Sequence, residues 1–299
     1  VLGLGALDDF ELNLDLASDT AAPGYLNQVA ILDVLPISEQ WNYMQGIKWD
    51  RYMEDGKWTF VLSRNMLNNS AFKHVDNDVD LPRTLDYVSE EIENKFRAER
   101  YRILPSGWKV SGGMNAEYAK YNNSTTSVVY VPDVGNVHVS FGSDFKLAKY
   151  GAFAQASRPL LDNRLTLSAG LRLDGAVLLD AAEGLTLPES SPLANPLDQF
   201  SPRLSASWSF APGWTWNANA GIYHQLPAYT ILGYAGLGAD STSTLLNWSE
   251  GLTYTTNRQL VMGIRKEIAS RNAAVSVEGF YKGYTDSPAS ANTGIALAN

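Results

Sequence analysis

Three histidines are the first residues in this 299-residue sequence whose side chains could do chemistry, as acid–base groups or metal ligands. His74, His138 and His224 lie far apart and share no spacing that is typical of a metal site. The motifs GxSxG and HExxH do not occur, and neither does a phosphate-binding loop. We therefore expect a protein that is not an enzyme, with the histidines as ordinary loop or wall residues.

The acidic segment DNDVD is the best candidate for a metal site. Asp76, Asp78 and Asp80 have the spacing of the first ligands of a calcium-binding loop. Such a loop needs glycine at its sixth position and glutamate at its twelfth, where this sequence has Leu81 and Tyr87. A solvated acidic loop explains the segment better, and we expect neither a metal nor a cofactor.

Aromatic residues in the stretch LPAYTILGYAGLGADSTSTLLNW offer a different chemistry, that of ligand binding. The rings of Tyr229, Tyr234 and Trp248 could stack on a sugar or pack against a siderophore or a peptide. They could equally anchor this stretch to its neighbours. Both interpretations need a framework that places the stretch at an outer rim.

That framework is indicated by DNRLTLSAGLRLDG, from Asp162 to Gly175. Leucine or alanine occupies positions 165, 167, 169, 171 and 173, and the positions between them are polar or glycine. A period of two over about ten residues predicts a β-strand with one apolar and one polar face. A protein core and lipid would both accept the apolar face.

Similar alternation recurs along the chain, and long periodic helices are hard to find. The segment Asp86 to Tyr101 is ambiguous because it is rich in good helix formers, but its alternation and its neighbours predict a strand. The other expected strands are 10–16, 41–49, 58–65, 108–121, 146–158, 203–210, 214–225, 258–268 and 273–284. The sequence therefore predicts an all-β, antiparallel protein.

The expected connections alternate between short and long. The short ones, such as APG before Trp214 and PLLDN before Arg164, hold the residues of tight hairpins. Long loops are expected near 66–85, 122–145, 181–199 and 226–257. In an up-and-down sheet the short turns lie at one rim and the long loops at the other. Outer-membrane β-barrels, with their long extracellular loops, have this asymmetry.

Composition argues against several classes of protein. A net charge of -9 and the lack of a Lys/Arg run argue against nucleic acid as a partner. No cysteine is present for disulfides or zinc–thiolate sites, and no apolar run approaches the roughly 20 residues of a membrane helix. VLGLGALDDF does not have the pattern of a signal peptide, so we expect any export signal to lie upstream of Val1.

Three features favour lipid as the partner of the apolar faces. The polar faces repeat small hydrophilic residues, for example Ser205, Ser207 and Ser209. Tyrosine and tryptophan gather beside the short turns, as in the aromatic girdle at a membrane interface. Strands of about ten residues match the about 9–11 that cross a bilayer, whereas soluble strands average about five or six. The alternative is a soluble β-sandwich or barrel with tryptophan in its core.

Several ordered segments also resemble a known family. YGAFAQASRPLLDNRLTLSAGLRLDG, NPLDQFSPRLSASWSF and WTWNANAGIYHQLPAY are similar to barrel strands of TonB-dependent outer-membrane receptors, especially those of Bacteroidota-type bacteria. GIKWDRYMEDGKWTFVLSRN and YVSEEIENKFRAE resemble earlier strands of the same barrels. The resemblance implies a transmembrane β-barrel of about 22 strands closed by an N-terminal plug domain, with transport driven by TonB.

Residues 1–299 are too few for such a barrel with its long loops. About 22 strands of about ten residues need ~220 residues before any loop is counted, so this chain has room for about ten to twelve strands. We therefore expect an internal part of a larger barrel in the bacterial outer membrane, surrounded by lipid, with the plug domain outside this chain. TonB would engage the missing plug region, and a surface lipoprotein is a further candidate partner.

The polar faces of the strands would line the lumen of this barrel, where they contact the plug or solvent rather than substrate. These lumen-facing residues include Arg172, Asp174, Arg203, Asn217, Asn219 and Tyr223. The predicted function is TonB-dependent active transport of a nutrient across the outer membrane. The alternatives are a passive porin-type barrel and a soluble β-rich carbohydrate-binding or hydrolytic protein.

Overall fold

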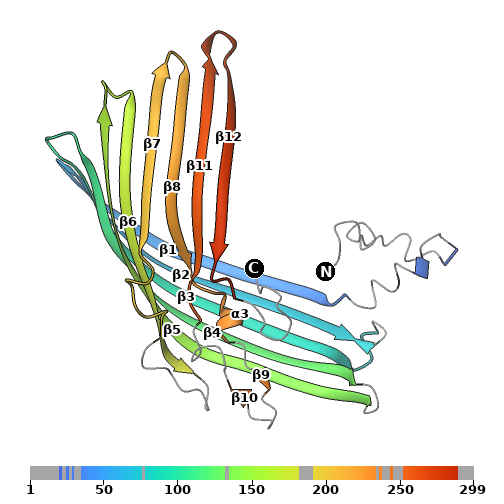
Figure 1. The fold of residues 1–299 in the computed structure, drawn as a ribbon. Helices are drawn as coiled ribbons and strands as arrows, with labels where there is room; N and C mark the ends of the chain where they lie inside the picture. Colours follow the sequence, from blue (N-terminus) through green and yellow to red (C-terminus); the bar gives the residue numbers. More distant parts are fainter. Residues whose placement is uncertain are drawn as a thin grey trace. The chain divides into compact units, whose positions relative to one another are not determined.

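The computed structural model describes residues 20–21, 25–26, 29, 35–75, 78–131, 135–181, 191–233, 236–237, 243–244 and 252–288. Strands dominate these residues (Figure 1), so the prediction of an all-β, antiparallel fold is confirmed. The expected strand at 10–16 lies outside them. Among the residues described, no helix is long and apolar enough to cross a membrane.

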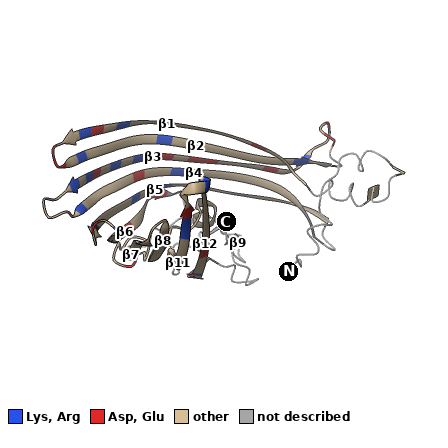
Figure 2. Cartoon of the chain, turned by 90° about the horizontal axis from the view of Figure 1, so that it is seen from above, with Lys and Arg blue, Asp and Glu red and all other residues tan. Residues whose placement is uncertain are grey.

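Ten strands in the described part form one sheet, in which each strand pairs with its neighbours in chain order. They are β1 (Ile37–Met53), β2 (Gly56–His74), β3 (Arg83–Ile103), β4 (Lys109–Val131), β5 (Gly135–Leu160), β6 (Leu165–Ala181), β7 (Ser201–Ala211), β8 (Trp214–Gln225), β11 (Thr255–Ile268) and β12 (Ala273–Thr285). Between β8 and β11 lie α3 (Tyr229–Leu232) and a small sheet of β9 (Gly236–Leu237) and β10 (Ser243–Thr244). Charged residues are frequent on β1–β5 and sparse on β7 and β8 (Figure 2).

The chain divides into two units. The first contains Val1–Asn42, Leu67–Glu90 and Asn123–Gly142, and the second contains Tyr43–Met66, Glu91–Asn122 and Ser143–Asn299. In the first unit, the Arg83 side chain pairs with Asp86 at 2.9 Å and lies 4.5 Å from the centroid of the Phe72 ring. The second unit contains every residue discussed below as part of a site.

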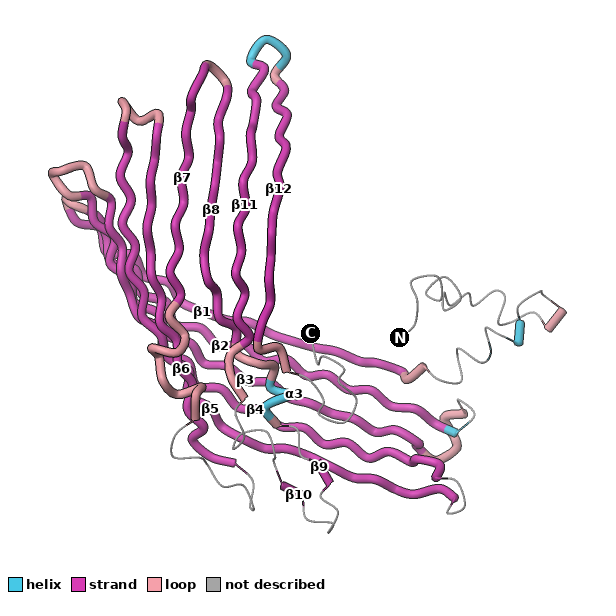
Figure 3. The backbone as a smooth tube through the Cα atoms, in the orientation of Figure 1, coloured by secondary structure: helices cyan, strands magenta, loops and turns pink. Residues whose placement is uncertain are grey.

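Short turns join the strands of the second unit in pairs (Figure 3). They occupy 54–55, 104–108, 161–164, 212–213 and 269–272, the last containing the 3₁₀ turn Ala269–Arg271. Gly213 and Asn272 adopt positive φ angles of 73° and 47°, which glycine and asparagine tolerate best. In the first turn Asp55 accepts hydrogen bonds from Arg100 and Arg102, and the bond from Arg100 holds the pKa of Asp55 below its usual value.

Two of the expected long loops consist mostly of strand. β2 continues to His74 and β3 begins at Arg83, while β4 and β5 are separated only by 132–134. The prediction of loops spanning 66–85 and 122–145 is therefore wrong. Their Asn/Ser-rich starts suggest loops, but β-branched and aromatic runs such as TTSVVYV favour strands, and cross-strand pairing satisfies their backbone groups. The ambiguous segment 86–101 lies within β3, as predicted.

A buried apolar cluster lies on one face of β4, β5 and β6. Tyr121, Phe145, Leu147 and Leu178 come from the strands, and the ring centroids of Tyr121 and Phe145 are 5.3 Å apart. The segments that connect the strands pack against these side chains with Leu193, Tyr229, Leu232 and Tyr254. The chain's own connections therefore cover part of one face of the sheet, at β4, β5 and β6.

Candidate functional site

Apolar and polar rows alternate across β6, β7, β8 and β11. The strand register places apolar residues opposite one another in a row across the four strands, namely Ala169, Leu204, Ala220 and Leu260. The adjacent row is polar and contains Ser168, Ser205 and Asn219. The apolar face is open, since Leu171 is 45% and Leu204 63% exposed. The polar parity of β6 continues to Ala176 and Leu178 in the buried cluster, so the connecting segments cover this end of the polar face.

An ion pair on β6 organises the polar face. Arg172 donates from Nε and Nη2 to the two carboxylate oxygens of Asp174, each at 2.6 Å, and from Nη2 to Asn115 Oδ1 at 3.0 Å. Gly151 on β5 pairs with Asp174 and leaves room for this arrangement. The sequence predicted a shared face for Arg172 and Asp174, whereas no sequence motif marks Asn115 or Gly151.

Arg203 lies on the same face and stacks on Tyr223. Its guanidinium carbon is 4.3 Å from the centroid of the Tyr223 ring, a cation–π contact. Gly221 permits this stack, because a Cβ there would lie 3.0 Å from the ring and 3.2 Å from Arg203 Cγ. Arg203 is the only Lys, Arg, Asp or Glu on β7 and β8, both of which the structure describes in full.

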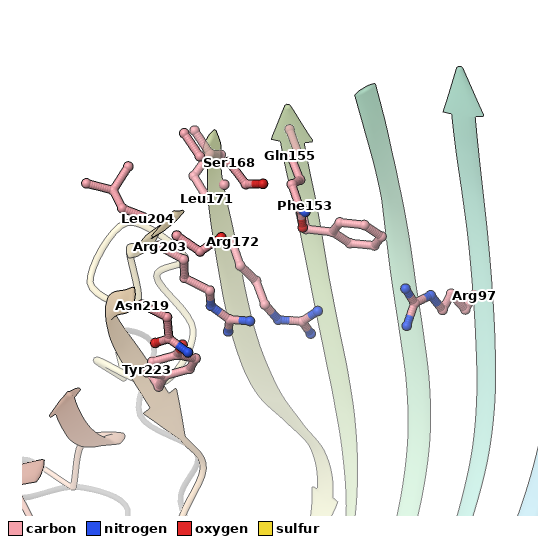
Figure 4. Close-up of a pocket in the computed structure, with 14 residues that line it drawn as sticks. Arg97, Phe153, Gln155, Ser168, Leu171, Arg172, Arg203, Leu204, Asn219 and Tyr223 are labelled. Carbon is pink, nitrogen blue, oxygen red and sulfur yellow. The ribbon is translucent and has the colours of Figure 1, made fainter. Parts of the chain in front are cut away.

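A pocket of about 390 Å³ lies among these residues (Figure 4). Its lining includes Arg97, Arg172, Arg203, Asn219 and Tyr223. It thus brings together four of the six residues that the sequence predicts to face the lumen, and adds Arg97 of β3, which the sequence did not single out. The remaining two are close by: Asp174 binds Arg172, and Asn217 accepts a hydrogen bond from Ser207 at 2.7 Å.

A second charged cluster ties the segment after β8 to the strands. The Tyr229 hydroxyl donates to Glu93 Oε1 at 2.6 Å and accepts a hydrogen bond from Lys149 Nζ at 2.6 Å. Lys149 also pairs with Glu93 at 3.1 Å and with Glu117, and Lys95 pairs with Glu93 at 2.6 Å. We call Glu93, Lys95, Glu117, Lys149 and Tyr229 the anchor cluster. Of these residues, only Tyr229 is a candidate from the sequence.

The position of Tyr229 does not fit a ligand-stacking role. Its side chain is buried at 7% exposure, with its ring 6.0 Å from that of Tyr121 and 6.1 Å from that of Phe145. Burial, followed by the hydrogen bond to Glu93, raises the pKa of the Tyr229 hydroxyl, which therefore stays protonated. Tyr229 anchors its segment instead. Tyr234 and Trp248, the other two aromatic candidates, lie outside the described residues.

The three histidines lie in different parts of the structure. His74 Nδ1 lies 2.6 Å from the carbonyl oxygen of Leu81, His224 Nδ1 lies 2.9 Å from Ser201 Oγ, and His138 is on β5. In the described ranges, no three His, Asp or Glu side chains are grouped so that they could hold a metal ion. Asp76 of the acidic segment is outside those ranges.

Gly151→Ala is expected to lower the free energy of unfolding by about 1–3 kcal/mol. The new Cβ would lie 2.5 Å from Asp174 Oδ1 and 3.0 Å from the backbone oxygen of Leu173. Gly170→Ala is the matched control on the same face, because its nearest neighbour would be 3.4 Å away. Urea unfolding in detergent, followed by tryptophan fluorescence, measures both variants. Equal losses of stability would contradict the close fit at Gly151.

Comparison with known proteins gives a match to one family. The family described as TonB dependent receptor-like, beta-barrel, matches residues 5–298. No curated protein gives a significant match.

Solved structures of receptors and transporters are similar in fold. The copper transporter OprC is 16% identical with a TM-score of 0.57, over 81% of this chain and 39% of that one. The ferric yersiniabactin uptake receptor FyuA from Yersinia pestis is 10% identical with a TM-score of 0.57, over 83% and 36%. A mutant of the ferric enterobactin receptor PfeA from Pseudomonas aeruginosa is 15% identical with a TM-score of 0.54, over 83% and 35%. The chain therefore spans 35–39% of the length of these three structures.

Proposed function

Because the chain belongs to the TonB-dependent receptor-like β-barrel family, we propose that it forms part of the wall of an active nutrient transporter energised through TonB. Proteins of this family are barrels of the bacterial outer membrane, which is the location expected from the sequence. The family consists of transporters and receptors rather than enzymes, in agreement with the sequence-based expectation.

The observation that carries this proposal is the open apolar face. Leu171, Leu204 and Ile264 are 45%, 63% and 45% exposed, on three strands of one sheet. Water-soluble monomers rarely expose an apolar surface that extends across several strands, because the hydrophobic effect drives it into contact with other apolar groups. Lipid provides that contact in an outer-membrane barrel, where apolar residues point outward and polar ones inward.

The polar face is proposed to line the lumen, with the six lumen-facing residues toward the plug or toward water. Within the described residues β1 and β12 are the edges of the sheet. Unpaired strand edges are very costly in lipid, so strands outside this chain would pair with both edges to close a barrel of about 22 strands. The anchor cluster would hold the segment after β8 against the inner wall.

The test uses the complete gene product that contains this chain. After purification from outer membranes in detergent, it is expected to bind the periplasmic domain of TonB and to show no steady conductance in a planar lipid bilayer. Steady conductance without TonB binding would identify a passive porin. Recovery as a monomer from a detergent-free soluble fraction would support the soluble alternative. Co-purification of a surface lipoprotein from the same membranes tests that further partner.

A further inference from the structure

The pocket on the polar face has an excess of positive charge. Three guanidinium groups line it, and no acidic residue does. Arg97 pairs with Glu99 at 2.7 Å, and Arg172 pairs with Asp174. Arg203 contacts the Tyr223 ring but forms no ion pair within the part of the chain that the structure describes. Among the described residues, one of the three cations is therefore left without a carboxylate.

The neighbouring strands leave Arg203 accessible. In the sheet it is paired with Gly170 on β6 and with Gly221 on β8, so neither directly paired position carries a side chain. Tyr223 supports one face of the guanidinium, which restricts its orientation before any ligand binds. Figure 4 shows Arg203 and Arg172 directed into the same pocket, with Asn219 beside them.

We propose that this pocket binds a carboxylate group, with Arg203 as its main partner and Arg97 and Asn219 as additional hydrogen-bond donors. The planar guanidinium fork matches the two oxygens of a carboxylate, and such charge-assisted bonds are among the stronger hydrogen bonds in proteins. The proposal rests on the proposed function, which makes the pocket lumenal. The carboxylate comes either from an acidic side chain of the polypeptide that fills the lumen or from a free solute.

Arginine modification distinguishes the two sources. The complete gene product in detergent is treated with phenylglyoxal, and mass spectrometry follows the modification rates of Arg203 and of Arg271, an exposed arginine in the β11–β12 turn. Citrate serves as the free carboxylate. In a parallel sample, about 1 M NaCl shortens the Debye length to about 3 Å and weakens accessible ion pairs.

A free carboxylate site predicts that saturating citrate slows modification of Arg203 by about tenfold and leaves Arg271 unchanged. A site filled by the polypeptide predicts that Arg203 reacts about tenfold more slowly than Arg271 without citrate, and that high salt removes much of this difference. A rate at Arg203 that neither citrate nor salt changes would overturn the proposal. Because TonB binding is measured on the same preparation, failure of the pocket is distinguishable from failure of the transporter assignment.

Discussion

Lys149→Met is expected to lower the free energy of unfolding by about 2–4 kcal/mol, because it leaves Glu93 and Glu117, which are poorly solvated, with Lys95 as their one remaining cation in the described part of the chain, at 2.6 Å and 3.9 Å. The Lys149 side chain is 22% exposed, and those of Glu93 and Glu117 are 14% and 13% exposed. Methionine preserves most of the volume, so the loss reports on charge rather than on packing. The variant also removes the hydrogen bond to Tyr229, which should loosen the segment after β8.

Lys146→Met is the matched control on the same strand. Lys146 pairs with Asp180 at 2.5 Å, but these side chains are 36% and 58% exposed. Exposed ion pairs contribute little, so this variant should change stability by at most about 1 kcal/mol. Urea unfolding from lipid vesicles, followed by tryptophan fluorescence, compares the two. Equal losses of stability in the two variants would show that the ion pairs of the anchor cluster contribute no more than an exposed ion pair does.

Leu167→Arg is expected to cost about 2–4 kcal/mol if residue 167 lies near the middle of the bilayer. Leu167 lies on the apolar face of β6, pairs with Ala206, and is 43% exposed. In a water-soluble sheet a residue this exposed would accept arginine at small cost, because the charged head could reach water. A large loss in lipid therefore favours the membrane assignment over the soluble alternative.

Thr166→Arg provides the control at nearly the same depth. Thr166 is the next residue on β6 and pairs with Ser207 in a polar row. Substitutions toward a wet lumen leave barrel stability largely intact, so we expect a change within about 1 kcal/mol. The same vesicle unfolding experiment measures both variants. Similar losses for Leu167→Arg and Thr166→Arg would contradict the assignment of the two faces.

Local patterns predicted the strands because period-two alternation is a local property. The alternation from 165 to 174 predicted both faces of β6, and the segment 86–101 was correctly predicted as a strand despite its helix-forming residues. Prediction failed where strands continue through polar sequence, as in β4 after Asn122, because no apolar parity marks them there. Pairing with neighbouring strands, which is a long-range property, keeps these segments extended.

The anchor cluster could not be predicted, because its residues are distant in the sequence. Tyr229 and Glu93 are separated by 136 positions. One signal of the cluster was present in the sequence. Charged residues occupy alternate positions on one face of a strand, at Glu91, Glu93 and Lys95. Charged groups that are even partly buried need partners, so a face of this kind favours contact with other charged residues. The partners Glu117 and Lys149 follow only from the strand order β3-β4-β5.

Spin labelling along β6 tests the central claim most directly, because the sequence of this chain contains no cysteine that would complicate it. Single cysteines are introduced at positions 165–172 of the complete gene product, and the spin labels are examined in outer-membrane lipid. Oxygen dissolves in lipid, so it should reach the labels at positions 165, 167, 169 and 171 more readily. A water-soluble nickel chelate should reach the labels at the positions between them more readily. Equal accessibility along the strand, or the opposite phase, would contradict a lipid-facing wall.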